Sequence, residues 1–317
     1  MPERLSAFAE THGPEIEARL RLLCPRSSLA GAEKLNEALD YAVSSGGKRV
    51  RPLLCLLAAG VFRTPAETAL EIASGVEFLH LSSVILDDLP AMDDAKTRRH
   101  RPALHVAYGE SMAILAAMAL YAKAFAIFAP WPAIVSEAAQ ATGSNGMTGG
   151  QAADLNCAGA SRFEKTTALM RFALTAGGLA GQASPGQLDA LARFGGLTGE
   201  AYQICDDLLD ALGSEHLAGK TVGQDLRHGR SVFAPGFGIE EARLRMQGLI
   251  EAAVTALRAG LPVCGELDAL CEFAEGIVER AAVLVENTHV DTGGGGRAAG
   301  AGGGEYGLVA AGPGPER

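Results

Sequence analysis

The sequence predicts an all-α fold in a single domain, and three observations support this. Apolar residues recur at helical spacing: Leu54, Leu57, Ala58 and Val61 fit the i, i+3, i+4, i+7 pattern of one helix face. The chain is rich in Ala, Leu, Glu and Arg, which favour helices. No obvious linker divides its 317 residues, of which 48% are hydrophobic and 20% charged. That composition suits a protein with ample core.

Turn-forming residues divide the chain into its elements. Glycine and proline interrupt helices, so we read breaks at residues 44–47, 129–132, 143–146 and 184–186. Apolar and helix-favouring stretches between and beyond these breaks predict the remaining helices. Those helices are residues 66–86, 111–128, 136–143, 165–179, 185–212, 240–258 and 266–287.

We expect residues 1–292 to form the helical domain and residues 293–317 to form a disordered tail. The tail contains eleven glycines and almost no large apolar side chains, so it cannot bury enough surface to order itself. Residues 213–231 are polar and Gly-rich, directly after a cluster of aspartates. They predict a mobile loop over a functional site.

Charge, cysteine usage and hydropathy limit the classes of protein to consider. The net charge of −10 disfavours nucleic-acid binding, which usually needs a basic surface. No signal pattern opens the chain and no uninterrupted apolar run reaches the ~18 residues of a membrane span, so we expect no stable membrane insertion. The cysteines lack CxxC spacing, which favours free thiols in a reducing cytoplasm. They are Cys24, Cys55, Cys157, Cys205, Cys264 and Cys271.

The first aspartate cluster follows an apolar helix. Asp87 and Asp88 end that helix, and Pro90 then disrupts helix geometry. A break at Pro90 is needed to return Asp93 to the side of Asp87, because six residues of ideal helix would leave them about 120° apart. Spacing does not decide between Asp93 and Asp94. Carboxylates this close repel one another unless cations neutralise them, and Mg²⁺ is the cation that prefers such oxygen ligands.

The second cluster lies within a predicted helix. Asp206 and Asp210 stand at i and i+4 and share a face, whereas Asp207 points aside and could bind through water. A solvated acidic helix surface is the plain alternative. Neighbouring leucines, and Gln203 nearly one turn earlier, favour a site instead.

Basic residues accompany both clusters and predict a diphosphate site. Gly46 and Gly47 precede Lys48 and Arg51, which gives an NH-rich turn beside two cations. His80 lies seven residues before Asp87 on the same helix face, although a satisfied core histidine would look the same. The further basic residues are Arg98, Arg99, Lys165 and Lys220.

Together these motifs resemble the trans-isoprenyl diphosphate synthases, the polyprenyl synthetases. The segments that match, in the family's order, are residues 46–52, 80–94 with 98–102, 149–154, 164–166 and 202–210. The resemblance covers roughly residues 30–285. It implies an isoprenoid-synthase helical bundle around a central active-site cavity, usually in a homodimer.

The resemblance also implies roles for individual residues, with three Mg²⁺ in each active site. The expected metal-binding residues are Asp87, Asp88, Asp93, Asp206, Asp207 and Asp210. The allylic diphosphate would contact Arg98, Gln151, Asp154, Lys165, Thr166, Gln203 and Lys220, and isopentenyl diphosphate would contact Lys48, Arg51, His80 and Arg99. Asp87, Asp88, Asp93, Asp206, Lys165 and Lys220 would serve catalysis directly.

Chain length in this family depends on the depth of the pocket. A bulky aromatic residue four or five positions before the first motif limits the product to C15, whereas Ser82 and Ser83 stand there in this chain. We therefore expect geranylgeranyl diphosphate (C20), with a farnesyl or longer-chain synthase as the alternative. Met118, Tyr121 and Phe125 on the following helix could supply the floor instead.

Several positions depart from the family pattern. Gln224 stands where the family usually has lysine, and Ala116-Ala117 replaces a Gly-Asp pair. A class I terpene cyclase also uses an aspartate motif, but it needs no isopentenyl site of the kind that Lys48 and His80 indicate. A non-catalytic partner subunit would be expected to lose aspartates, and both clusters are intact here.

Overall fold

The computed structural model describes residues 3–156, 163–212 and 238–292, with side chains at all of these except 210–212 and 283–292. The all-α prediction is confirmed. Within the described residues, extended structure is limited to an antiparallel pair of two-residue strands, β1 (Thr97–Arg98) and β2 (Arg101–Pro102). The predicted loop at 213–231, Cys157 and the predicted tail at 293–317 lie outside the described residues.

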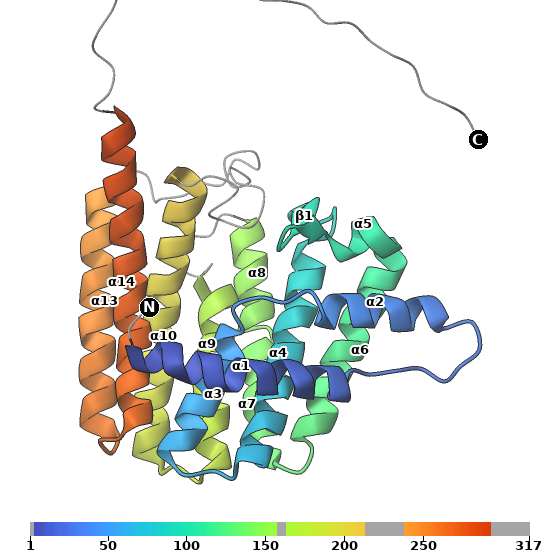
Figure 1. Ribbon diagram of the computed structural model, residues 1–317, viewed down its shortest axis with the longest axis horizontal. Helices are drawn as coiled ribbons and strands as arrows, with labels where there is room; N and C mark the ends of the chain where they lie inside the picture. The colour runs from blue at the N-terminus through green and yellow to red at the C-terminus, as the bar shows by residue number, and fades with distance from the viewer. Residues whose placement is uncertain (1–2, 157–162, 213–237, 293–317) are drawn as a thin grey trace, which may run out of the picture.

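The centre of the bundle is α9 (Glu164–Ala180), which is buried along most of its length. In Figure 1 the other helices stand around it. The helices that pack against α9 are α3 (Val50–Val61), α4 (Ala66–Asp87), α7 (Pro132–Thr142), α8 (Met147–Leu155) and α10 (Pro185–Leu212).

The remaining helices close the bundle from outside. In Figure 1, α1 (Glu3–Leu23) runs across it, and α13 (Ile239–Gly260) and α14 (Gly265–Thr292) stand together at one side. Further helices lie at the opposite side, and α6 packs on α4. They are α2 (Glu33–Val43), α5 (Leu104–Tyr108) and α6 (Glu110–Phe128).

The predicted helices are all present, with ends within a few residues of the expected ones. Four helices were not predicted: α1, α2, α5 and α8. In α8 the pair Gly149-Gly150 disfavours helix locally, but the tertiary contact requires glycine. A Cβ on Gly150 would lie 2.1 Å from the backbone N of Lys165. The close packing of α8 on the start of α9 therefore overrides propensity.

The apolar core contains several buried aromatic rings. Phe78, Phe128, Phe172 and Phe194 are all almost fully buried. The rings of Phe128 on α6 and Phe172 on α9 meet edge to face, 5.4 Å between centroids, which is a favoured aromatic geometry. This core holds α4, α6 and α9 at fixed separations, and two of these helices carry predicted site residues.

Two described helices, α4 and α6, are long and apolar enough to cross a membrane by length and composition alone. The sequence expectation, which counted uninterrupted apolar runs, had excluded such a segment. In α4, 67% of the apolar window is buried within the bundle, as in the core helix of a globular protein. In α6 only 39% is buried, so α6 leaves an apolar face uncovered.

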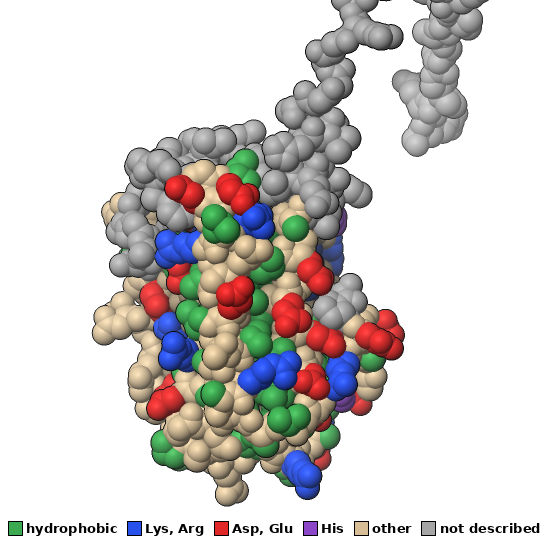
Figure 2. All heavy atoms as spheres, turned by 90° about the vertical axis from the view of Figure 1, so that its left-hand side faces the viewer, with side chains coloured by type: hydrophobic (Ala, Val, Ile, Leu, Met, Phe, Trp, Pro, Cys, Tyr) green, Lys and Arg blue, Asp and Glu red, His purple; other side chains and the backbone are tan. Residues whose placement is uncertain are grey.

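The side formed by α13 and α14 is a mixed polar surface. Figure 2 shows acidic and basic side chains interspersed with apolar ones over this face. Arg243 pairs with Glu240 at 2.5 Å, and Arg258 lies 3.6 Å from Asp268. Exposed pairs of this kind contribute little to stability. The layer is attached by the packing of α13 on α10 and of α14 on α10, α3 and α1.

We predict that Gly177→Ala destabilises the protein, because α3 and α9 meet at this glycine. An added Cβ would lie 2.3 Å from the carbonyl O of Cys55, and such overpacking costs about 1–3 kcal/mol. Gly248→Ala is the control. It lies in α13 with nothing within 4 Å of the added Cβ, so the helix should gain about 0.5–1 kcal/mol. Urea unfolding measures both free energies; equal effects would contradict the packing argument.

Candidate functional site

A cavity of about 370 Å³ opens between α3, α4, α8 and α9. It brings together six of the predicted site residues, from helices far apart in the sequence: Arg51, His80, Asp87, Gln151, Lys165 and Thr166. One part of its wall is therefore ionic. Another part is apolar, lined by Val84, Leu86, Met147 and Leu155.

The chain after α4 folds back on itself at Pro90. The backbone N–H of Asp93 donates to the carbonyl O of Asp87 at 3.0 Å, so Asp93 returns to the side of Asp87. Asp94 instead adopts a left-handed conformation, φ 48°, and pairs with Lys96 at 2.7 Å near the surface. Spacing had left Asp93 and Asp94 equivalent, and this turn distinguishes them.

Asp87 is held in a crowded electrostatic environment. Burial and, next, the nearby charge of Asp93 raise the pKa of its carboxyl to about 6, although Lys165 and Arg98 oppose the shift. The side-chain N–H of Gln151 on α8 donates to Asp87 Oδ1 at 2.6 Å. The protein thus orients this carboxylate without fully neutralising it, which leaves it suited to bind a cation.

Asp88 is buried and faces Arg98. The Arg98 Nε–H donates to Asp88 Oδ1 at 2.9 Å, and a second guanidinium N–H contacts the same oxygen. Burial raises the pKa of Asp88, and the charge of Arg98 opposes that shift. Asp88 therefore holds Arg98 in place beside the cluster, and Asp87 and Asp93 are the more accessible pair.

The start of α9 joins the two aspartate clusters. Lys165 Nζ lies 2.5 Å from Asp154 Oδ2. Burial lowers the pKa of Lys165, but Asp87 and Asp154 raise it by more, so the ammonium stays charged. Next to it, Thr166 Oγ1 donates to Gln203 Oε1 at 2.6 Å.

Gln203 continues this connection to the second cluster on α10. Its side-chain N–H donates to Asp207 Oδ1 at 2.8 Å, and Asp207 is buried. Asp206 lies 3.6 Å from Arg280 of α14 and within electrostatic reach of Lys48. Its charge, together with burial, raises the pKa of Tyr202 to about 12. The Asp210 side chain and Lys220 lie outside the described part of the chain.

Basic and imidazole side chains gather near the first aspartate cluster, and two of them, Arg51 and His80, line the cavity. Arg51 Nη1 lies 3.4 Å from His80 Nε2. Burial lowers the pKa of His80 well below its ordinary value, and the charge of Arg51 adds to this, so His80 is neutral at pH 7. Arg99 contacts the 44–47 turn through Ser45 Oγ at 3.1 Å and the carbonyl O of Gly46. The guanidinium groups of Arg51 and Arg99 carry the positive charge here, which suits an anion.

Comparisons with known proteins agree with this geometry. Residues 32–254 match the model of the family described as polyprenyl synthetase. The chain belongs to the polyprenyl synthetase family. It is a trans-prenyl diphosphate synthase, a prenyltransferase of isoprenoid biosynthesis.

Individual relatives of this synthase span most of its length. It is 35% identical over 236 residues to the geranylgeranyl diphosphate synthase of Cyanophora paradoxa, covering 68% of this chain and 79% of that one. It is 36% identical over 264 residues to the farnesyl diphosphate synthase of Escherichia coli (strain K12), covering 77% and 88%. The crystal structure of geranylgeranyl pyrophosphate synthetase from Pyrococcus horikoshii Ot3 superposes with a TM-score of 0.75, at 27% identity, covering 87% and 98%.

Several cavity residues of the synthase were not foreseen from the sequence. They are Val84, Leu86, Met92, Met147, Thr148, Ala152 and Leu155. Three of the cavity residues lie on one face of α8, because their spacing is i, i+4 and i+8: Met147, Gln151 and Leu155. That spacing was visible in the sequence, but α8 was not predicted as a helix.

Among the residues that the structure describes, no three His, Cys, Asp or Glu side chains form a ready-made metal site. The five described cysteines are free, as expected, and four of them are buried. A hard cation held by Asp87 and Asp93 would take its further oxygen ligands from water or from an anionic ligand.

We predict that Asp87→Asn stabilises the metal-free synthase at pH 7.5. The folded-state pKa of about 6 exceeds the ordinary 3.8, so the wild-type fold loses stability as the pH rises from about 4 through 6. A shift of about 2 units corresponds to at most about 3 kcal/mol. Unfolding in EDTA should show the gain at pH 7.5 and little at pH 4, with Asp94→Asn as control. A gain that is independent of pH would contradict this electrostatic cause.

Proposed function

We propose that this synthase joins isopentenyl diphosphate to an allylic diphosphate, head to tail, in a Mg²⁺-dependent reaction, with geranylgeranyl diphosphate (C20) as main product. The observation that carries the proposal is the two-part cavity. Its ionic part fits diphosphate groups, and its apolar part, lined by Met147 and Leu155, fits a prenyl chain. Both relatives described above are named for products of this class.

The residues present fit Mg²⁺. Asp87 and Asp93 lie together and carry oxygen donors, and the neighbouring cations Lys165 and Arg98 offset the raised pKa of Asp87 only in part. We propose that they bind Mg²⁺ from one side and that Asp206, with Asp207 and Asp210, binds it from the other. When bound, Mg²⁺ would stabilise the negative charge that develops on the leaving diphosphate.

The chain's own cations would share this task. Lys165 remains charged beside Asp87, so it can hold the allylic diphosphate as the allylic C–O bond breaks. Arg51, Arg99 and Lys48 would hold isopentenyl diphosphate. His80 is neutral, so it can donate a hydrogen bond without competing for the proton. The released diphosphate is then the base for the final proton.

Product length would follow from the apolar part of the cavity. Ser83 lines the cavity, whereas Ser82 is buried at 3% exposure. A small side chain at Ser83 leaves room for a chain longer than C15, which supports the C20 proposal. The alternative floor would come from α6. There, Met118 is 63% exposed, and the hydroxyl of Tyr121 forms a hydrogen bond with Thr142 Oγ1 at 2.8 Å.

We also propose a homodimer that covers the exposed face of α6. Four large apolar side chains on this helix, Ile114, Leu115, Met118 and Tyr121, are between 38% and 63% exposed. A contiguous apolar face of this kind on a protein surface marks an interaction site, and a second copy of the chain would bury it.

The decisive assay combines purified protein, Mg²⁺, labelled isopentenyl diphosphate and a C5, C10 or C15 allylic diphosphate. We expect linear prenyl diphosphates, chiefly C20. Cyclic hydrocarbons would instead indicate a terpene cyclase, and inactivity with every allylic partner would indicate a non-catalytic subunit.

We predict that Asp87→Ala and Asp206→Ala each lower turnover by roughly 10²–10³-fold, the usual effect of removing one electrostatic stabiliser. Asp94→Ala is the matched control, because Asp94 turns away to Lys96. Its turnover should stay close to that of the wild type. Steady-state kinetics at saturating substrates measures all three, and near-normal turnover of both test variants would refute the metal-binding assignment.

We predict that Ser83→Phe shifts the product from C20 towards C15, because a ring would fill part of the cavity. Met118→Phe serves as comparison, since Met118 lies on the exposed face of α6. Chromatography of the dephosphorylated products measures chain length. An unchanged product after Ser83→Phe, with a shorter one after Met118→Phe, would move the floor of the pocket to α6.

A further inference from the structure

The turn that joins α2 to α3 has an unusual backbone. Three of its residues have positive φ: Gly46 at 70°, Gly47 at 125° and Arg49 at 45°. Glycine tolerates this region, but an arginine does so only against steric cost. Arg49 occupies it at the N-cap of α3 without a side-chain cap. Contacts elsewhere must therefore hold Arg49 in this conformation.

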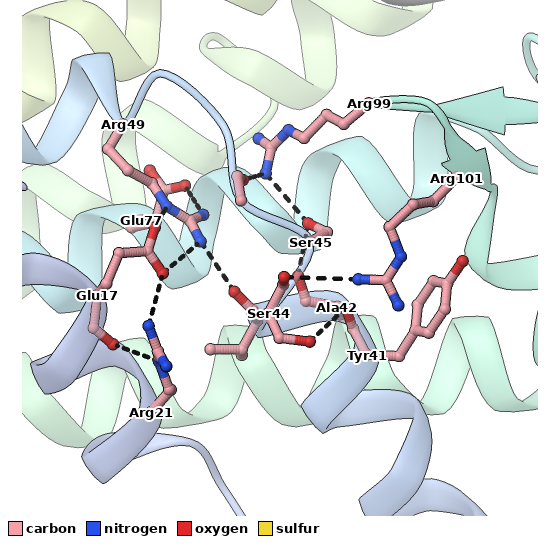
Figure 3. A network of polar contacts seen from close by, with 12 residues as sticks. Glu17, Arg21, Tyr41, Ala42, Ser44, Ser45, Arg49, Glu77, Arg99 and Arg101 are labelled. Atoms are coloured by element: carbon pink, nitrogen blue, oxygen red, sulfur yellow. Dashed lines mark hydrogen bonds and ion pairs between the residues drawn. The ribbon is translucent and has the colours of Figure 1, made fainter. Parts of the chain in front are cut away.

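The Arg49 side chain supplies those contacts. It is buried, and its Nε–H donates to Glu17 Oε1 of α1 at 2.7 Å while Nη1–H donates to Glu77 Oε1 of α4 at 2.7 Å. Its Nη2–H donates to the carbonyl O of Val43, at the end of α2, at 2.8 Å. Figure 3 shows the guanidinium between these elements. One side chain thus ties the turn to three helices.

Arg99 fixes the same turn from the other side. Its guanidinium contacts Ser45 Oγ and the carbonyl O of Gly46 (Figure 3). It also packs directly on Gly47, where an added Cβ would lie only 2.5 Å from Arg99 Cζ. The turn is therefore clamped between two guanidinium groups, and glycine at position 47 is what lets the second one approach.

Glu77 is the buried countercharge of this cluster. It is 1% exposed, and its Oε2 has no hydrogen-bond partner among the described residues. Its charge favours the protonated state of Arg49, Arg51 and Arg99 alike. It stands one turn before His80 on α4. A single carboxylate thus offsets part of the repulsion among three guanidinium groups beside the cavity.

We infer that Arg49 is a positioning residue for the isopentenyl diphosphate site, in which its ion pairs with Glu77 and Glu17 aim Lys48 and Arg51 at one anion. The inference rests on the proposed function. Lys48 precedes Arg49 directly and Arg51 follows two residues later, so the conformation of Arg49 sets the direction of both. Three bonds to three different groups need the planar fork of arginine, and lysine cannot reproduce them.

Two variants and one control test this role. Arg49→Lys keeps the charge and removes the fork. Glu17→Gln removes only the partly exposed partner and is the milder change should Arg49→Lys fail to fold. Arg26→Lys is the matched control, because Arg26 makes an exposed two-contact pair with Asp40 on the neighbouring α2, at 2.6 and 2.7 Å.

The first readout is the KM for each substrate. Arg49→Lys should raise the KM for isopentenyl diphosphate at least about tenfold, since a displacement of about 1 Å has effects of this size or larger. The KM for the allylic diphosphate should stay unchanged, and Glu17→Gln should show the same split more weakly. An equal rise in both KM values, or a lower melting temperature with neither KM changed, would assign Arg49 a purely structural role.

The second readout separates this inference from the proposed function. Calorimetry with inorganic pyrophosphate in EDTA reports on a site made of cations alone. Arg49→Lys should bind pyrophosphate about tenfold more weakly than the wild type, and Arg26→Lys should bind it equally well. Weakened binding in a protein that makes no prenyl product would leave the positioning role standing and overturn the proposed function. Unchanged pyrophosphate binding would overturn the positioning role itself.

Discussion

The repulsion between Asp87 and Asp93 is the interaction on which the rest of this site depends. The return of the chain at Pro90 brings the two carboxylates together, and partial burial raises the pKa of Asp87 to about 6. Gln151 orients the Asp87 carboxylate, and the charge of Lys165 attracts it. The fold thereby holds two carboxylates close together at a cost in stability. A divalent cation bound between them would offset their repulsion.

The surrounding helices are arranged so that this repulsion cannot relax. α9 packs against α3, α4, α8 and α10 together, and it carries Lys165 and Thr166 at its buried start. Its approach to α3 is close enough to require glycine at 177, and the approach of α8 requires glycine at 150. Close-packed interiors transmit such constraints. The bundle therefore acts as a rigid frame that fixes charges of both signs around one cavity.

Much of this could be predicted from the sequence, for identifiable reasons. The long helices α4, α6, α9, α10, α13 and α14 are continuous apolar or helix-favouring stretches between turn-forming residues. The aspartate clusters are local in sequence, so both features are visible without a structure. Spacing alone left open the choice between Asp93 and Asp94, which only the family resemblance indicated, because that choice depends on the backbone turn after Pro90. The helix α8 was missed because the pair Gly149-Gly150 disfavours a helix locally. Glycine stands at position 150 because α8 packs too closely on the backbone of Lys165 to leave room for a side chain. The buried Arg49–Glu77 pair joins residues 28 positions apart, and no local pattern announces it.

The coupling between cation and anion binding tests the central claim most directly. If the Asp87–Asp93 pair is completed only by a ligand that brings its own oxygens, Mg²⁺ titrated by calorimetry should bind much more tightly in the presence of inorganic pyrophosphate than without it. Asp87→Asn should abolish this enhancement, and Asp94→Asn should leave it intact. Mg²⁺ affinity that is the same with and without pyrophosphate, or an enhancement that survives Asp87→Asn, would contradict the account.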